Sequence, residues 1–116
     1  MFHMTAALEL ASSLRRGTLE FCVLALLREQ PRYGVELAQE LAAARALATT
    51  EGTLYPMLSR LRRSGWVATS WQESPSGPPR RYYTLTPDGR AALEHFRTEW
   101  VEFRDAVDRI VGTETR

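Results

Sequence analysis

The chain has 116 residues, of which 44% are hydrophobic and 25% charged, a balance typical of one small globular domain. Its single cysteine, Cys22, excludes an internal disulfide and favours a reducing compartment. The longest unbroken apolar run outside alanine-rich segments, "FCVLALL", is far shorter than the roughly 20 residues that a membrane helix needs. We therefore expect a cytoplasmic protein with no membrane partner.

The charges are distributed unevenly. The net charge is only +1, yet residues 45–90 carry seven arginines against three acidic residues, whereas the segments on either side are net negative. A basic middle indicates a surface for a negatively charged partner. Because a domain this small buries only about two-thirds of the surface of its unfolded chain, a dimer contact would add useful burial.

Two helices are expected in the first half. Residues 14–28, "LRRGTLEFCVLALLR", are apolar on nearly all sides and predict one helix buried against several neighbours. The breaker "EQPRYG" ends it, and "YGVELAQELAAA" predicts a short second helix. Residues 1–13 form an extension of helical composition.

A third helix is predicted over about 53–63, either starting there or preceded by a looser turn from Thr50, and it is ended by Gly65. Leucines recur at i, i+4 and i+7 on one face, while arginines lie on the opposite face. Pro56 would disrupt a helix interior, so we expect Thr53 to be the N-cap, which places Pro56 in the first turn. One face of this helix is therefore core and the other basic.

A hairpin and a last helix follow. "WVATSWQ" (66–72) and "RRYYTLT" (80–86) predict two strands, joined by a seven-residue loop, "ESPSGPP". "TPDG" predicts a helix start, with Thr86 as N-cap, Pro87 at the first helical position and Asp88 in the first turn. Apolar residues of the last helix repeat at heptad spacing, which favours packing between two chains over packing within one; the repeat runs through Leu93, Phe96, Trp100, Phe103, Val107 and Ile110.

Three helices, a strand, a loop, a strand and a helix define an α+β, mainly α, winged helix-turn-helix. In this architecture the third helix enters the major groove and the hairpin reaches the flanking backbone or the minor groove. The alternative is a winged-helix module that binds an acidic protein. An enzyme is not expected, because no phosphate loop or nucleophile motif occurs, and His3, His95 and Cys22 lack metal-ligand spacing. No metal or cofactor is expected either.

The blocks "GTLYPMLSRL" and "SGPPRRYYTLT", with "LRRGTLEFCVLALL" and "YGVELAQEL", closely resemble the PadR family of bacterial transcriptional regulators. The resemblance covers about 14–111 and points to the short branch, with a single helix after the wing. It implies a winged helix-turn-helix over 14–87 and a dimerisation helix over 88–116. It further implies a homodimer on a pseudo-palindromic operator, acting as a repressor that a small molecule or another signal releases.

Site residues follow from the residues and from this resemblance. The expected contacts to double-stranded DNA are Thr53, Tyr55, Ser59, Arg60, Arg63, Ser76, Gly77, Arg80 and Arg81. Three alternatives stay open: Tyr55 packs against a helix, Arg60 and Arg63 form a solvated face, and Arg81 is half-buried against an acid. Tyr83 is expected in the core.

The resemblance also implies a ligand site and a dimer interface. Phe96, Trp100 and Phe103 would line a cavity between subunits for a planar hydrophobic molecule. The alternative is a filled dimer core without a ligand. The expected interface comprises Leu19, Leu93, Phe96, Trp100, Phe103, Val107 and Ile110.

Overall fold

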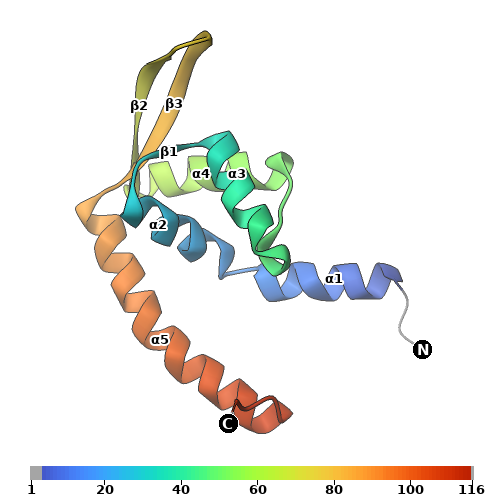
Figure 1. Ribbon diagram of the computed structural model, residues 1–116. Helices are drawn as coiled ribbons and strands as arrows, with labels where there is room; N and C mark the ends of the chain where they lie inside the picture. Colours follow the sequence, from blue (N-terminus) through green and yellow to red (C-terminus); the bar gives the residue numbers. More distant parts are fainter. Residues whose placement is uncertain (1–3, 116) are drawn as a thin grey trace.

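The computed structural model describes residues 4–115 (Figure 1). The elements follow in the order α1 (Met4–Arg15), α2 (Leu19–Glu29), β1 (Arg32–Tyr33), α3 (Gly34–Ala43), the 3-10 turn η1 (Arg45–Leu47), α4 (Glu51–Arg63), β2 (Val67–Ser74), β3 (Gly77–Leu85) and α5 (Pro87–Val111). Helices predominate beside one small antiparallel sheet, so the predicted α+β class is confirmed. None of the helices between residues 4 and 115 is long and apolar enough to cross a membrane.

A leucine-rich core holds α2, α3 and α4 together. Full burial of one leucine side chain contributes about 1.5 to 3 kcal/mol relative to leaving it exposed. The side chains with almost no exposed surface are Val23, Leu24, Leu37, Leu41, Leu54, Leu58, Leu61 and Leu93. This core fixes the three helices relative to one another and leaves the outer face of α4 in solvent.

The first helix differs from the prediction. A single helix over 14–28 is wrong, because α1 ends at Arg15 and α2 begins at Leu19. Gly17 takes a left-handed conformation with φ of +85°, which side chains rarely adopt, and this breaks the helix. None of the residues in α1 is buried, and in Figure 1 this helix projects away from the rest of the domain. Its apolar side chains, including Met4, Leu8 and Leu14, are exposed.

Helix α4 begins earlier than expected. Thr50, not Thr53, is the N-cap, and its Oγ1 accepts a hydrogen bond from the Thr53 amide at 3.3 Å. Pro56 therefore lies in the second turn, where it cannot donate to the carbonyl of Gly52. Burial of the leucine face offsets this loss. Gly65, with φ of +79°, follows the end of the helix as predicted.

The wing is a longer hairpin than expected. The predicted seven-residue loop is wrong, because β2 and β3 continue until only Pro75 and Ser76 separate them. Pro78 and Pro79 suggested a loop, but β1 pairs with β3 only at Tyr82 and Tyr83, so prolines near the tip cost no ladder hydrogen bond on that side. The strand order is β1-β3-β2, and the two-residue strand β1 was not predicted.

Helix α5 starts as predicted and then leaves the domain. The Thr86 hydroxyl accepts a hydrogen bond from the Gly89 amide at 3.0 Å, and Pro87 occupies the first turn. The start of α5 packs on α2 through Leu93, whereas Phe103 and Ile110 are 63% and 83% exposed. Figure 1 shows that its second half extends away from the wing. The exposed stripe on α5 therefore has no cover within the described chain.

Candidate nucleic-acid interface

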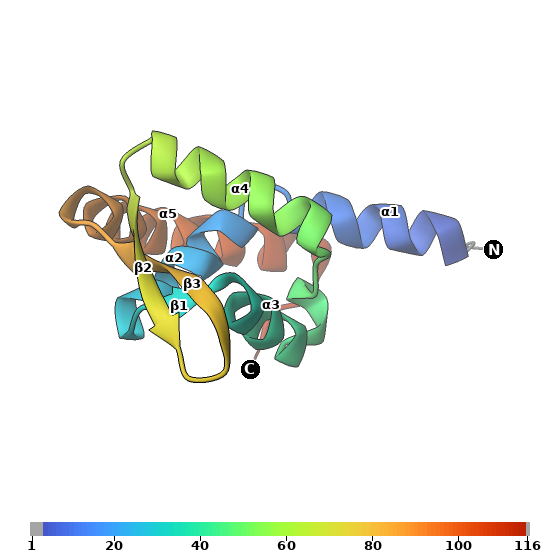
Figure 2. The ribbon, with the colours of Figure 1, turned by 90° about the horizontal axis from the view of Figure 1, so that it is seen from above.

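The outer face of α4 and the wing stand on the same side of the core (Figure 2). With 3.6 residues per turn, Tyr55 and Arg60 point about 140° apart around α4, and Ser59 and Arg63 lie between them. Tyr55, Arg60 and Arg63 are exposed and Ser59 is half-buried, while the opposite face of the helix is buried in the core. The helix thus has a central outer face and two flanks.

Tyr55 forms the flank toward the wing. Its ring lies against the start of α3, since a Cβ placed on Gly34 would be 2.5 Å from the Tyr55 hydroxyl oxygen. Burial raises the pKa of the Tyr55 phenol, and the nearby Glu51 carboxylate raises it further. The phenol is therefore neutral at physiological pH and can donate a hydrogen bond. The packing covers Tyr55 only in part, because the residue stays 39% exposed.

The arginines of the wing base are held by aromatic side chains. The guanidinium carbon of Arg80 lies 4.6 Å from the centre of the Tyr33 ring, which is a cation–π geometry. Arg81 donates to Thr69 Oγ1 at 3.5 Å and lies 5.9 Å from the Trp71 ring centre. Arg81 is half-buried, as one of the alternatives had it, but it forms no ion pair with an acid within residues 4–115. The Nε of Arg81 is buried without a hydrogen-bond partner in the same part of the chain.

These side chains surround a hollow between α3, α4 and the wing. The hollow has a volume of about 260 Å³, and its lining residues are Tyr33, Gly34, Val35, Tyr55, Arg80, Arg81 and Tyr83. Two arginines, three tyrosines and the amino end of α3 line this hollow, and the two guanidinium groups suit an anion. Tyr83 is buried, as expected.

The other predicted site residues lie elsewhere. Ser76 and Gly77 are exposed at the wing tip, while Thr53 and Arg60 lie on the far flank of α4. Tyr33 and Gly34 were not predicted for the site. The "YG" pair before the second helix is visible in the sequence, but nothing local shows that Tyr33 supports an arginine 47 positions later.

A second candidate site, which is apolar, lies along α5. Phe21, Phe96, Trp100 and Phe103 form a continuous row, with successive ring centres 4.3, 5.8 and 6.0 Å apart. The last three also line a hollow of about 660 Å³ that faces the end of α1. The three aromatic residues predicted to share a site are thus neighbours.

Two residues predicted for the dimer interface are buried within the single chain. Leu19 and Leu93 are only 4% and 2% exposed, because both pack inside the core of their own chain. They offer little surface to a partner. Cys22 is half-buried, and burial raises the pKa of its thiol. No group of three metal-ligating side chains occurs within residues 4–115, and His3 lies outside the described residues.

Helices α3 and α4, with a basic hairpin beside them, define a winged helix-turn-helix protein of the DNA-binding class. Residues 23–95 match the Transcriptional regulator PadR-like family. A PadR-like transcription factor from Bacteroides fragilis is similar in structure, with 40% identity and a TM-score of 0.72 over 88% of this chain and 98% of that one. A PadR family transcriptional regulator from Eggerthella lenta has 35% identity and a TM-score of 0.79 over 93% of this chain and 94% of that one.

A curated relative of similar sequence is also a transcriptional regulator. Transcriptional regulator Rv3488 of Mycobacterium tuberculosis is 43% identical over 65 residues, which cover 56% of this chain and 59% of the relative. The chain belongs to the PadR-like family of transcriptional regulators. It is a DNA-binding regulator of transcription and not an enzyme.

Proposed function

We propose that the protein is a homodimeric repressor that binds a pseudo-palindromic operator and is released by a planar hydrophobic molecule. The observation that carries the proposal is the hollow where Tyr55, Arg80 and Arg81 meet the amino end of α3. Its two guanidinium groups and its helix N-terminus can bind one phosphate of the DNA backbone. This contact sets the register of α4 in the major groove.

The central outer face of α4 then reads base edges. Ser59 and Arg63 lie between the two flanks, where a helix in the major groove comes nearest to the bases. Arg63 can donate two hydrogen bonds to the O6 and N7 of guanine. Ser76 and Gly77 at the exposed wing tip lie where a wing meets the neighbouring backbone.

Dimer formation is supported by the exposed apolar side chains of α1 and α5. Leu14 is 70% exposed and Ile110 is 83% exposed, although leucine and isoleucine are usually buried. Apolar surface of this extent, on two helices that leave the domain, marks a protein contact. A second copy would cover it through α1, Phe96, Trp100, Phe103, Val107 and Ile110, and this pairing would present two α4 helices to one palindrome.

The hollow beside Trp100 is the proposed effector site. Its lining of stacked aromatic rings suits a flat apolar molecule, and its volume of about 660 Å³ falls within the usual range for small-molecule sites. A molecule bound there would contact both α1 and α5, the two helices proposed to set the spacing of the operator half-sites.

Two variants test the proposal through sequence preference. Binding of a fluorescent duplex from upstream of the gene is measured by anisotropy, with a shuffled duplex in parallel. Arg63→Gln should weaken binding to the upstream duplex by about 10-fold to 100-fold and to the shuffled duplex much less. Arg80→Gln should weaken both about equally, because a phosphate carries no sequence information.

Arg109→Gln, which removes the same charge near the far end of α5, is the matched control and should bind like the unmodified protein. If Arg63→Gln binds both duplexes as tightly as the unmodified protein, the assignment of the reading face is wrong. An acidic protein partner bound in place of DNA would support the interaction-module alternative.

A further inference from the structure

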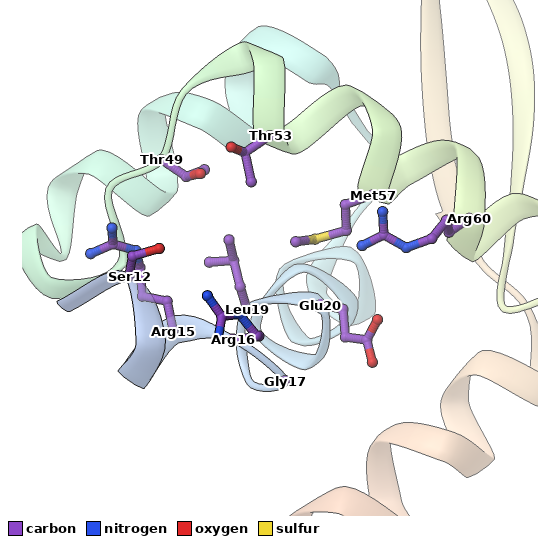
Figure 3. A pocket seen from close by; sticks show the side chains of 10 residues that line it. All are labelled: Ser12, Arg15, Arg16, Gly17, Leu19, Glu20, Thr49, Thr53, Met57 and Arg60. Carbon is purple, nitrogen blue, oxygen red and sulfur yellow. The ribbon is translucent and has the colours of Figure 1, made fainter. Parts of the chain in front are cut away.

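A second basic hollow lies on the flank of α4 opposite Tyr55 (Figure 3). It has a volume of about 250 Å³ and opens between the end of α1, the start of α2 and the outer side of α4. The residues that line it are Ser12, Arg15, Arg16, Gly17, Leu19, Glu20, Thr49, Thr53, Met57 and Arg60. Arginines from two separate parts of the chain therefore converge on one space.

The three arginines differ in what holds them. Arg15 donates from Nη1 to the carbonyl oxygen of Ala46 at 3.3 Å, so its guanidinium ties the end of α1 to the turn before α4. Arg16 and Arg60 are exposed and make no ion pair or side-chain hydrogen bond within residues 4–115. Figure 3 shows the Arg60 guanidinium directed toward Met57 and Arg16 at the lower edge of the hollow beside Leu19. Arg15 is thus a positioning residue, and Arg16 and Arg60 have donors available.

The left-handed Gly17 explains why Arg16 reaches this space. The glycine follows the end of α1 and turns the chain back into α2, and Arg16, directly after α1, lines the hollow beside α4. The break between the helices therefore builds the basic flank.

The shape of DNA suggests an occupant. The major groove is about 12 Å wide and is bounded by the phosphates of two strands, so a helix inside it has one backbone on each side. Tyr55 and the wing face one backbone, and the opposite flank, about 140° away around α4, carries Arg60 and the hollow. We propose that Arg16 and Arg60 bind a phosphate of the second DNA strand, with Thr53 as a further donor. This inference rests on the proposed DNA-binding function.

Glu20 contributes a negative charge beside the arginines, and this charge allows a test of the proposal. It lines the same hollow, and Figure 3 shows its carboxylate at the rim, directed away from α4. Three arginines against one glutamate leave a formal charge of +2 in this lining. The glutamate weakens the attraction for a phosphate, so its removal and the removal of Arg16 must change DNA binding in opposite directions.

The experiment measures the affinity of the full chain for the shuffled duplex, which reports backbone contacts, over a series of salt concentrations. Each neutralised phosphate contributes a slope of about −0.9 in log K against log salt. Arg16→Gln should make the slope shallower by about 1 per protomer and weaken binding roughly fivefold per protomer near 150 mM salt. Glu20→Gln should tighten binding at low salt. Arg109→Gln should change neither the salt slope nor the affinity.

The outcomes separate the possibilities. If the unmodified protein binds DNA with a steep slope and Arg16→Gln leaves that slope unchanged, the second backbone contact is refuted while the proposed function stands. If the unmodified protein shows no salt-dependent DNA binding at all, the proposed function is refuted, and the second backbone contact is refuted with it. Inorganic phosphate that raises the melting temperature only when Arg16 is present, with an unchanged DNA slope, would assign the hollow to a free phosphate compound and overturn the proposal. Circular dichroism of each variant verifies folding.

Discussion

Gly89→Ala tests whether the start of α5 is locked onto the base of the wing. A Cβ built on Gly89 would lie 2.0 Å from the Trp66 carbonyl oxygen and 2.7 Å from Leu85 Cδ1. The first of these atoms is backbone, and it already accepts a hydrogen bond from the Thr86 amide at 3.1 Å. The added methyl group therefore overpacks the contact between α5 and the base of the wing and breaks this hydrogen bond.

The expected cost combines three effects. Overpacking of a tight contact costs about 1 to 3 kcal/mol. Loss of the Thr86 to Trp66 hydrogen bond adds about 0.5 to 1.5 kcal/mol. Alanine is the better helix former and returns about 1 kcal/mol. The net loss is roughly 2 kcal/mol, which for a chain of this length lowers the melting temperature by about 8 °C.

Thermal unfolding followed by circular dichroism, at one fixed protein concentration, measures this loss. Gly52→Ala is the matched control, because Gly52 is also in the first turn of a helix but has only Thr50 Oγ1 within 4 Å of a built Cβ, at 3.7 Å. We expect Gly52→Ala to melt at the same temperature as the unmodified chain or slightly higher. If Gly89→Ala melts within about 2 °C of the unmodified protein, the close packing of α5 on the wing base is wrong.

Three shorter predictions concern the core, the dimer and the thiol. Arg32→Met should cost about 1 to 3 kcal/mol in urea unfolding, because Arg32 is 8% exposed and binds two glutamates and one backbone carbonyl; an unchanged midpoint would contradict this. Ile110→Glu should give a monomer by light scattering while Arg109→Gln stays dimeric, and equal masses would refute the α5 interface. Burial raises the pKa of Cys22, so less thiolate forms at pH 8, and a disulfide reagent should react more slowly with folded than with urea-unfolded chain. Equal reaction rates would show that the thiol is not shielded.

Local periodicity was enough to predict much of the fold. The leucines at i, i+4 and i+7 identified α4, and the "TPDG" start of α5 was confirmed down to its threonine cap. These signals are local, so a sequence carries them fully. The strand β1 is only two residues long and exists because it pairs with Tyr82 and Tyr83 far along the chain, which no local pattern reveals.

The wrong predictions concern features that depend on backbone conformation or tertiary placement and not on local periodicity. Gly17 sits among helix-forming residues, and only its positive φ shows that the helix stops there. Prolines in the wing indicated a loop, but their place near the tip of a hairpin is compatible with strand geometry. For the site, the sequence predicted the arginines of the wing, whereas the aromatic support beneath Arg80 and the second basic flank depend on tertiary placement.

The most direct test of the proposed function is the affinity of the unmodified protein for the duplex from upstream of its gene compared with a shuffled duplex, measured across salt concentrations. A sequence-reading α4 with backbone contacts on both flanks predicts a preference of about 10³ or more for the upstream duplex at physiological salt. It also predicts affinities for both duplexes that fall steeply as salt rises. Equal affinity for the two duplexes, or an affinity that ignores salt, would contradict it.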